Sequence, residues 1–172
     1  SRSQVYHFSP LTLDQVRDAG IDDELVVRWS QGSIGRAFAT DKDALREGRD
    51  QMLEFLETAM TASEAELASL LAASAELGRS KEDYSERIRI LGVLISDLLF
   101  MTEGIESRLV NVDIQDRLLA LSTTVAAERL VQIGDCLKFV ESNLKYHLNR
   151  QMMADVLALT LNKSTAEILN DN

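Results

Sequence analysis

One arginine stands in a short glycine-containing segment, Gly32-Ser33-Ile34-Gly35-Arg36-Ala37, that has the residue types of a helix start. Ser33 belongs to the residue types that cap a helix by accepting a backbone N–H. The glycines leave room for a neighbouring backbone or a ligand to approach closely. Arg36 would then project from the first turn, where the helix dipole favours an anion such as phosphate. We expect either a phosphate-sensing arginine here or a plain loop-to-helix junction with a surface arginine.

The sequence lacks the residues needed to hydrolyse a nucleotide. That reaction needs a phosphate-binding loop of the form GxxxxGK[ST] and an acidic metal ligand after a strand, and the sequence contains neither. Cys136 is the only cysteine, and the two histidines, His7 and His147, have no metal-ligand spacing. We therefore predict that this chain is not an ATPase by itself and that it holds no metal.

Composition predicts an all-α protein. One proline and eight glycines in 172 residues, with 5% aromatic residues, favour helices over a β-sandwich. The net charge of −10 argues against a surface that wraps nucleic acid, because phosphate contacts need clustered lysine and arginine. The longest apolar stretch, residues 88–101, contains Arg89 and Asp97 and is too short to span a membrane. With a single cysteine and no signal peptide, we expect a cytoplasmic location.

Apolar residues recur at helical spacing along most of the chain. Three short helices are expected to begin at Thr12, at Asp22-Asp23 and at Ser33. From residue 41 onward the chain is expected to be helical throughout, with a helix ended by Gly78 and a central, most buried helix from about 81 to 102.

A long helix capped by Thr124 is expected to carry a seam that packs against a partner helix. Its apolar residues alternate steps of three and four, namely Leu130, Ile133, Leu137, Val140, Leu144 and Leu148. A last helix follows Asn149. All five methionines are expected in the core: Met52, Met60, Met101, Met152 and Met153.

The first 40 residues resemble the end of the ATPase module in bacterial clamp-loader subunits. In that family a Ser-Arg-Cys motif precedes a last strand, a small helical lid follows, and its final helix carries Gly-Ser-x-Gly-Arg-Ala. Here Ser1-Arg2-Ser3 precedes the strand-like residues 4–8, and residues 32–37 match the lid motif. This form of the motif is most similar to delta-prime subunits of the DNA polymerase III clamp loader. Weaker matches extend the resemblance over nearly the whole chain: Leu94–Leu99, Asn111–Asp113, His147–Asn149 and Asp155–Leu159.

The resemblance implies two parts and two functional arginines. Residues 1–40 would be the end of an AAA+ module with its helical lid, and residues 41–172 a helical-bundle collar domain that oligomerises with neighbouring collars. Arg2 would be an arginine finger that reaches the ATP of a neighbouring subunit, a role that suits a planar group that stays charged. Arg36 would stand where the family senses nucleotide bound to its own subunit. This chain itself would hold no cofactor.

The resemblance also implies a role in DNA replication. The parent protein would be part of the DNA polymerase III holoenzyme, whose loader opens the sliding clamp and places it on primed DNA. The partners would be the delta and tau/gamma subunits through the collar, and the clamp and primed DNA through the assembly, with no membrane. Because the chain begins inside the Ser-Arg-Cys-like motif, we expect it to be a C-terminal fragment of a longer protein.

Two alternatives remain open. One is the collar of a tau/gamma subunit, although that relative usually carries a Met-Arg-Asp type lid motif. The other is a free-standing helical adaptor that binds one partner helix through the Leu130–Leu148 seam and has no connection with ATP.

Overall fold

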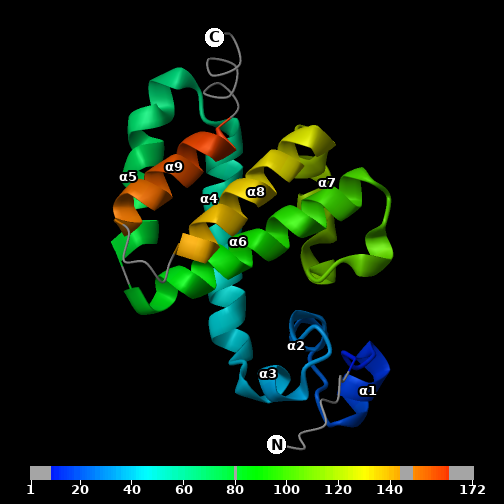
Figure 1. Ribbon diagram of the computed structural model, residues 1–172. Helices are drawn as coiled ribbons and strands as arrows, with labels where there is room; N and C mark the ends of the chain where they lie inside the picture. Colours follow the sequence, from blue (N-terminus) through cyan, green and yellow to red (C-terminus); the bar gives the residue numbers. More distant parts are fainter. Residues whose placement is uncertain (1–8, 80, 144–148, 163–172) are drawn as a thin grey trace, which may run out of the picture.

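The protein is all-α, as its composition predicted. A computed structural model describes residues 9–79, 81–143 and 149–162, and all regular structure in these ranges is helical. Figure 1 shows long helices packed into a bundle, with a unit of three short helices below it. The α-helices are α1 (Leu13–Asp18), α2 (Glu24–Trp29), α3 (Ile34–Ala39), α4 (Lys42–Thr61), α5 (Leu67–Arg79), α6 (Lys81–Thr102), α7 (Gln115–Ser122), α8 (Ala127–Asn143) and α9 (Arg150–Leu161). Single 3₁₀ turns are η1 (Glu64–Glu66), η2 (Glu106–Arg108) and η3 (Val112–Ile114).

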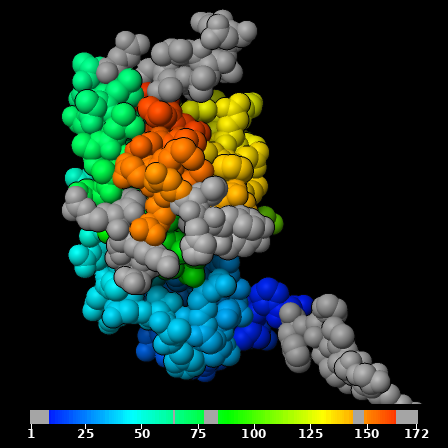
Figure 2. Space-filling view, turned by 60° about the vertical axis from the view of Figure 1, so that its left-hand side comes forward, coloured from blue at the N-terminus to red at the C-terminus, as the bar shows by residue number. Residues whose placement is uncertain are grey.

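The three short helices begin at the residues that the sequence predicted. Thr12 forms a capping box with Gln15, in which each side chain accepts the backbone N–H of the other residue. Asp23 accepts the N–H of Val26 and so caps α2. These helices enclose a small apolar cluster of their own, formed by Val16, Val26, Val27 and Ala37. Figure 2 shows this N-terminal unit (α1–α3) as a lobe beneath the bundle.

Helix α6 is the central helix of the bundle, as expected, and its ends agree with the prediction. It packs against α4, α5, α7 and α8, and in Figure 1 it runs alongside α8 and crosses α4. The apolar residues Ile88, Leu91, Leu94 and Leu98 are all buried on it, so α6 contributes core residues to several neighbours at once. Helices α5 and α9 pack side by side at one end of the bundle.

A carboxylate lies in the middle of this apolar packing. Asp97 on α6 is fully buried. Its Oδ1 accepts the N–H of Val110 at 2.9 Å, and its Oδ2 accepts the N–H of Asn111 at 2.9 Å and the Asn111 side-chain amide at 2.7 Å. Burial raises the pKa of the Asp97 carboxyl, while these hydrogen bonds and the charge of Arg28 oppose that rise. The carboxylate thereby fixes the connection between α6 and α7 to the central helix.

Ion pairs attach the same connection to α4. The buried Arg49 donates to both carboxylate oxygens of Asp113, at 2.7 and 2.6 Å. Arg117 on α7 pairs with Glu57 through two hydrogen bonds of 3.1 and 2.8 Å. Side chains of α4 thus hold α7 and the turn before it, and the Arg117–Glu57 pair has the bidentate geometry to which the guanidinium group is well suited.

The prediction that Thr124 caps the long helix is wrong. Its hydroxyl donates to the carbonyl of Leu121, and Thr123 likewise donates to Ala120, so both threonines close the end of α7. Helix α8 begins later, at Ala127. The first four residues of the predicted seam, Leu130 to Val140, are buried against α6 and α9. Leu144 and Leu148 lie outside the described residues.

Two smaller predictions about the bundle are also wrong. Helix α5 continues through Gly78 to Arg79. Met152 is 51% exposed, because α9 turns Met153, Ala154 and Leu157 toward the core and the neighbouring positions outward. Met52, Met101 and Met153 are buried as expected, and Met60 is partly buried against the core.

The Asp97→Ala variant should lose a large part of the stability of the bundle. Three N–H donors of Val110 and Asn111 would be left unpaired in a buried place, which should lower the free energy of unfolding by about 3 kcal/mol or more. Urea denaturation measures this change. Asp135→Ala is the matched control, because that carboxylate is exposed and its ion pair with Lys138 lies on the surface, and it should change stability by less than about 0.5 kcal/mol. Equal effects of the two variants would contradict the assignment.

Candidate functional site

Arg36 occupies the first turn of α3, as the sequence predicted. Its backbone N–H is accepted by Ser33 Oγ at 3.3 Å, so Ser33 caps the helix. The guanidinium is exposed and donates to Gln31 Oε1 at 3.3 Å. The structure therefore confirms the helix start that carries Arg36. The nucleotide-sensing role of this arginine stays a prediction.

Of the two glycines in the motif, one is required by the packing of the backbone. Gly32 has a φ of +78°, and a Cβ atom there would lie 2.5 Å from the carbonyl oxygen of Leu11. The N–H of Leu11 donates to the carbonyl of Gly32 at 3.1 Å. A Cβ at Gly35 would meet nothing within 4 Å. The close approach expected from the motif thus occurs at Gly32, and the group that approaches is the backbone of Leu11.

Arg36 faces a groove of about 580 Å³ between the N-terminal unit and the bundle. The guanidinium of Arg89 on α6 stacks over the ring of Trp29, 4.3 Å from its centroid. The charged side chains that line the groove balance, with three arginines (Arg36, Arg87 and Arg89) and three carboxylates (Asp41, Glu47 and Glu86). Asp41 also accepts the N–H groups of Asp43 and Ala44, so it occupies the donors at the start of α4. The groove as a whole therefore has no preference for an anion.

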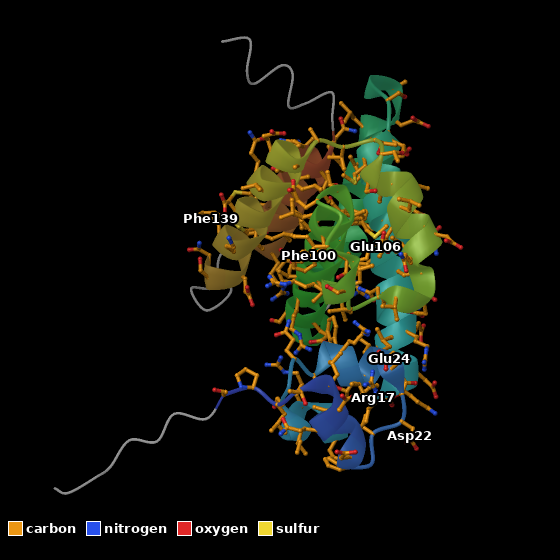
Figure 3. The ribbon with its side chains drawn as sticks, turned by 90° about the vertical axis from the view of Figure 1, so that its right-hand side faces the viewer. Arg17, Asp22, Glu24, Phe100, Glu106 and Phe139 are labelled. Carbon is orange, nitrogen blue, oxygen red and sulfur yellow. The ribbon has the colours of Figure 1, made fainter. Side chains whose placement is uncertain are left out.

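Arg28 fastens the N-terminal unit to the bundle. Its Nη1 donates to the carbonyl of Leu109 at 2.8 Å, and its Nε pairs with Glu24 at 2.5 Å. Glu24 is also paired with Arg17, whose hydrogen bond is the main cause of the lowered pKa of the Glu24 carboxyl. Figure 3 shows Arg17 and Glu24 together in the N-terminal unit, with Phe100 and Glu106 above them in the bundle. Arg46 on α4 also joins the two parts, through an ion pair to Asp23 at 2.7 Å.

Sequence reasoning missed the two residues that organise this region, Asp97 and Arg28. Asp97 interrupts an apolar run, and a charge in such a run signals a buried, hydrogen-bonded partner. The partner could not be named, because Val110 and Asn111 are 13 and 14 residues away. Arg28 and Leu109 are 81 residues apart, and nothing in the sequence links them.

The other predicted site residue, Arg2, lies outside the described residues, as does the strand-like stretch after it. The structure therefore does not place Arg2 relative to Arg36. Among the described residues, no three His, Cys, Asp or Glu side chains gather closely enough to hold a metal ion. None of the described helices is long and apolar enough to cross a membrane.

Comparison with known families decides what the bundle is. Residues 45–163 match the family described as "DNA polymerase III, delta subunit, C terminal". The chain belongs to this family. The match begins within α4 and runs just past the end of α9, so it covers the bundle and leaves out α1–α3. No curated protein and no solved structure matches the chain. The bundle is thus the C-terminal domain of a DNA polymerase III clamp-loader subunit, a family whose members associate with other clamp-loader subunits.

The two glycines of the Arg36 motif in this clamp-loader subunit should respond oppositely to alanine. Gly32→Ala adds a Cβ against Leu11 at a positive φ and should destabilise the protein by about 2 kcal/mol or more. Gly35→Ala is the matched control: it adds a methyl in open space within a helix and should stabilise by about 0.5–1 kcal/mol. Urea denaturation of both variants measures the difference, and a tolerated Gly32→Ala would show that the α1–α3 packing is described wrongly.

Proposed function

We propose that this chain is the C-terminal part of a clamp-loader delta-prime subunit, with the bundle as the collar and α1–α3 as the end of the lid. The main support is a combination of two features in one chain. The bundle belongs to the clamp-loader C-terminal family, and the Gly-Ser-Ile-Gly-Arg-Ala segment forms the start of α3, the helix directly before it, with Ser33 as its cap. In this proposal the collar holds the loader together while it opens the sliding clamp and places it on primed DNA in the cytoplasm.

The outer faces of the bundle support a role in assembly. The inner face of α8 is buried inside the bundle, with Leu130, Ile133 and Leu137 in the core. A neighbouring collar must therefore contact the outer faces of the bundle helices. Large apolar side chains are exposed there, namely Val131 and Phe139 on α8 and Met152 and Val156 on α9. Figure 3 shows Phe139 pointing away from the bundle. The partners in this proposal are the delta and tau/gamma subunits.

The two arginines take separate roles in the proposal. Arg2 acts in trans on the ATP of a neighbouring subunit, where a guanidinium neutralises the charge that develops on the transferred phosphoryl group. Arg36, exposed at the start of α3, stands where the family senses its own nucleotide. The ATP that Arg2 reaches is bound to the neighbouring subunit.

The family match favours a clamp-loader subunit over a free-standing adaptor. Among clamp-loader subunits, the residues Ile34-Gly35-Arg36 favour delta-prime over tau/gamma, which usually has a Met-Arg-Asp type motif at this place. The family description names the delta subunit, so the decisive experiment is one that separates delta from delta-prime.

The assembly test uses the whole chain with tagged delta and tau/gamma subunits from the same source. A delta-prime chain should join complexes that already contain delta. If this chain is a delta subunit, it would instead displace the added delta from the complex. If it is an adaptor, it would not join the complexes at all. Either result would contradict the proposal. Co-purification followed by mass measurement of the intact complex distinguishes the three.

Phe139→Glu should weaken this assembly by tenfold or more while leaving the fold intact, since the ring is 55% exposed on the collar. Phe38→Glu is the matched control, because Phe38 is 65% exposed on α3, outside the bundle. Circular dichroism checks the fold of both variants. Unchanged assembly of the Phe139→Glu variant would remove the outer face of α8 from the interface.

Arg2→Ala in the full-length subunit should reduce the clamp-dependent ATPase of the reassembled loader and leave assembly unchanged. Arginine fingers supplied in trans contribute on the order of 10³–10⁵ in rate in other phosphoryl-transfer systems, and a loader with several ATP sites should show a smaller loss. Lys138→Ala, which removes an exposed cation from α8, is the control. An unchanged ATPase rate in the Arg2→Ala loader would contradict the finger role.

A further inference from the structure

A second cleft, of about 390 Å³, lies where the N-terminal unit, α6 and the connection to α7 meet. It has no lining residue in common with the Arg36 groove. Leu13, Arg28 and Gln31 line it from the N-terminal unit, and Val93, Ser96 and Phe100 from α6. Its remaining wall is the turn that Asp97 holds, Ser107 to Val110. This volume falls in the range of clefts that bind small ligands or a few side chains of a peptide.

Apolar side chains make up much of the cleft. Leu13, Val93 and Phe100 are each only partly buried and line the cleft. The guanidinium of Arg108 lies 6.0 Å from the centroid of the Phe100 ring. An apolar group that enters the cleft would therefore contact an aromatic ring beside a cation.

The charge of the cleft is positive although the chain as a whole has a net charge of −10. Its lining includes two arginines, Arg28 and Arg108, and one carboxylate, Asp97. Asp97 is already occupied by the N–H donors of the turn. Arg28 is partly neutralised by Glu24, but Arg108 makes no ion pair with any described residue. Within the described part of the chain, Arg108 is thus a cation beside apolar side chains and has no carboxylate partner.

The walls of the cleft are held in place before any ligand arrives. Arg28 holds the Leu109 carbonyl, and Gln115 donates to Glu106 at 2.8 Å across the turn. A ligand therefore binds without having to order this loop, which favours affinity.

We propose that this cleft binds a short acidic and apolar segment of a partner protein. In the proposed complex, a large apolar side chain of the partner packs on the Phe100 ring. A neighbouring carboxylate of the partner pairs with Arg108. A nucleic acid fits less well, because a run of phosphates needs a row of cations and finds here two arginines around an apolar floor. The proposal does not depend on which clamp-loader subunit this chain is.

The test is an NMR titration of the whole ¹⁵N-labelled chain with a blocked peptide, Glu-Leu-Glu-Phe-Asp-Leu. Saturable shifts are expected at the amides of Val93, Phe100 and Arg108, with a Kd of about 1 mM or tighter. The neutral peptide Gln-Leu-Gln-Phe-Asn-Leu should bind about tenfold more weakly, because it lacks the charge-assisted pair.

Arg108→Glu should weaken the acidic peptide by tenfold or more without unfolding the protein, since the side chain is exposed and unpaired among the described residues. Lys138→Glu, with the same charge change on α8, should bind the peptide like the unmodified chain. Equal binding of the two peptides, shifts that avoid the cleft, or insensitivity to Arg108→Glu would each overturn the proposal. So would a thymidine oligonucleotide that displaces the peptide, because the ligand would then be a phosphate chain.

Discussion

The carboxylate of Asp97 is the constraint on which the rest of the structure depends. A charge buried in the central helix is unfavourable unless its oxygens are hydrogen-bonded, and the N–H groups of Val110 and Asn111 satisfy them. This pairing fixes the turn after α6, and the turn presents the Leu109 carbonyl to Arg28 of α2. The Arg28 contact that helps place the N-terminal unit on the bundle thus depends on a turn that Asp97 of α6 holds. Trp29, stacked under Arg89 and buried in the large core, adds the apolar part of the same junction.

This arrangement gives the clamp-loader subunit two different clefts beside the junction. The Arg36 groove has equal numbers of arginines and carboxylates among its lining residues, so its charges largely compensate one another. The cleft beside Phe100 has an arginine without a carboxylate partner among the described residues and an apolar floor. Both clefts take lining residues from the N-terminal unit and the bundle, so both would change shape if the unit moved on the bundle.

Local signals in the sequence predicted where four of the helices start. Thr12, Asp23, Ser33 and Asn149 each cap a helix, because the cap depends on one side chain and the N–H groups two or three residues later. The end of α6 at Thr102 follows from its apolar run, residues 88–101. The prediction for Thr124 was wrong because a threonine between two helices can hydrogen-bond either to the end of the first helix or to the start of the second. Here its hydroxyl donates to the carbonyl of Leu121, at the end of α7. For the candidate site, the sequence supplied the Arg36 helix start but not the contacts of Asp97, Arg28 or Arg108, which join segments distant in the chain.

The dependence of the N-terminal unit on Asp97 is tested most directly by hydrogen exchange in the Asp97→Asn variant. Asparagine keeps the shape of the side chain but sets an NH₂ group against one of the N–H donors of the turn. Exchange should then accelerate at Val110 and Asn111 and also in α2, at Glu24–Trp29, while the amides of α9 keep their protection. If exchange accelerates in the turn alone and α2 is unaffected, the N-terminal unit is held independently of the buried carboxylate, and the central claim is wrong.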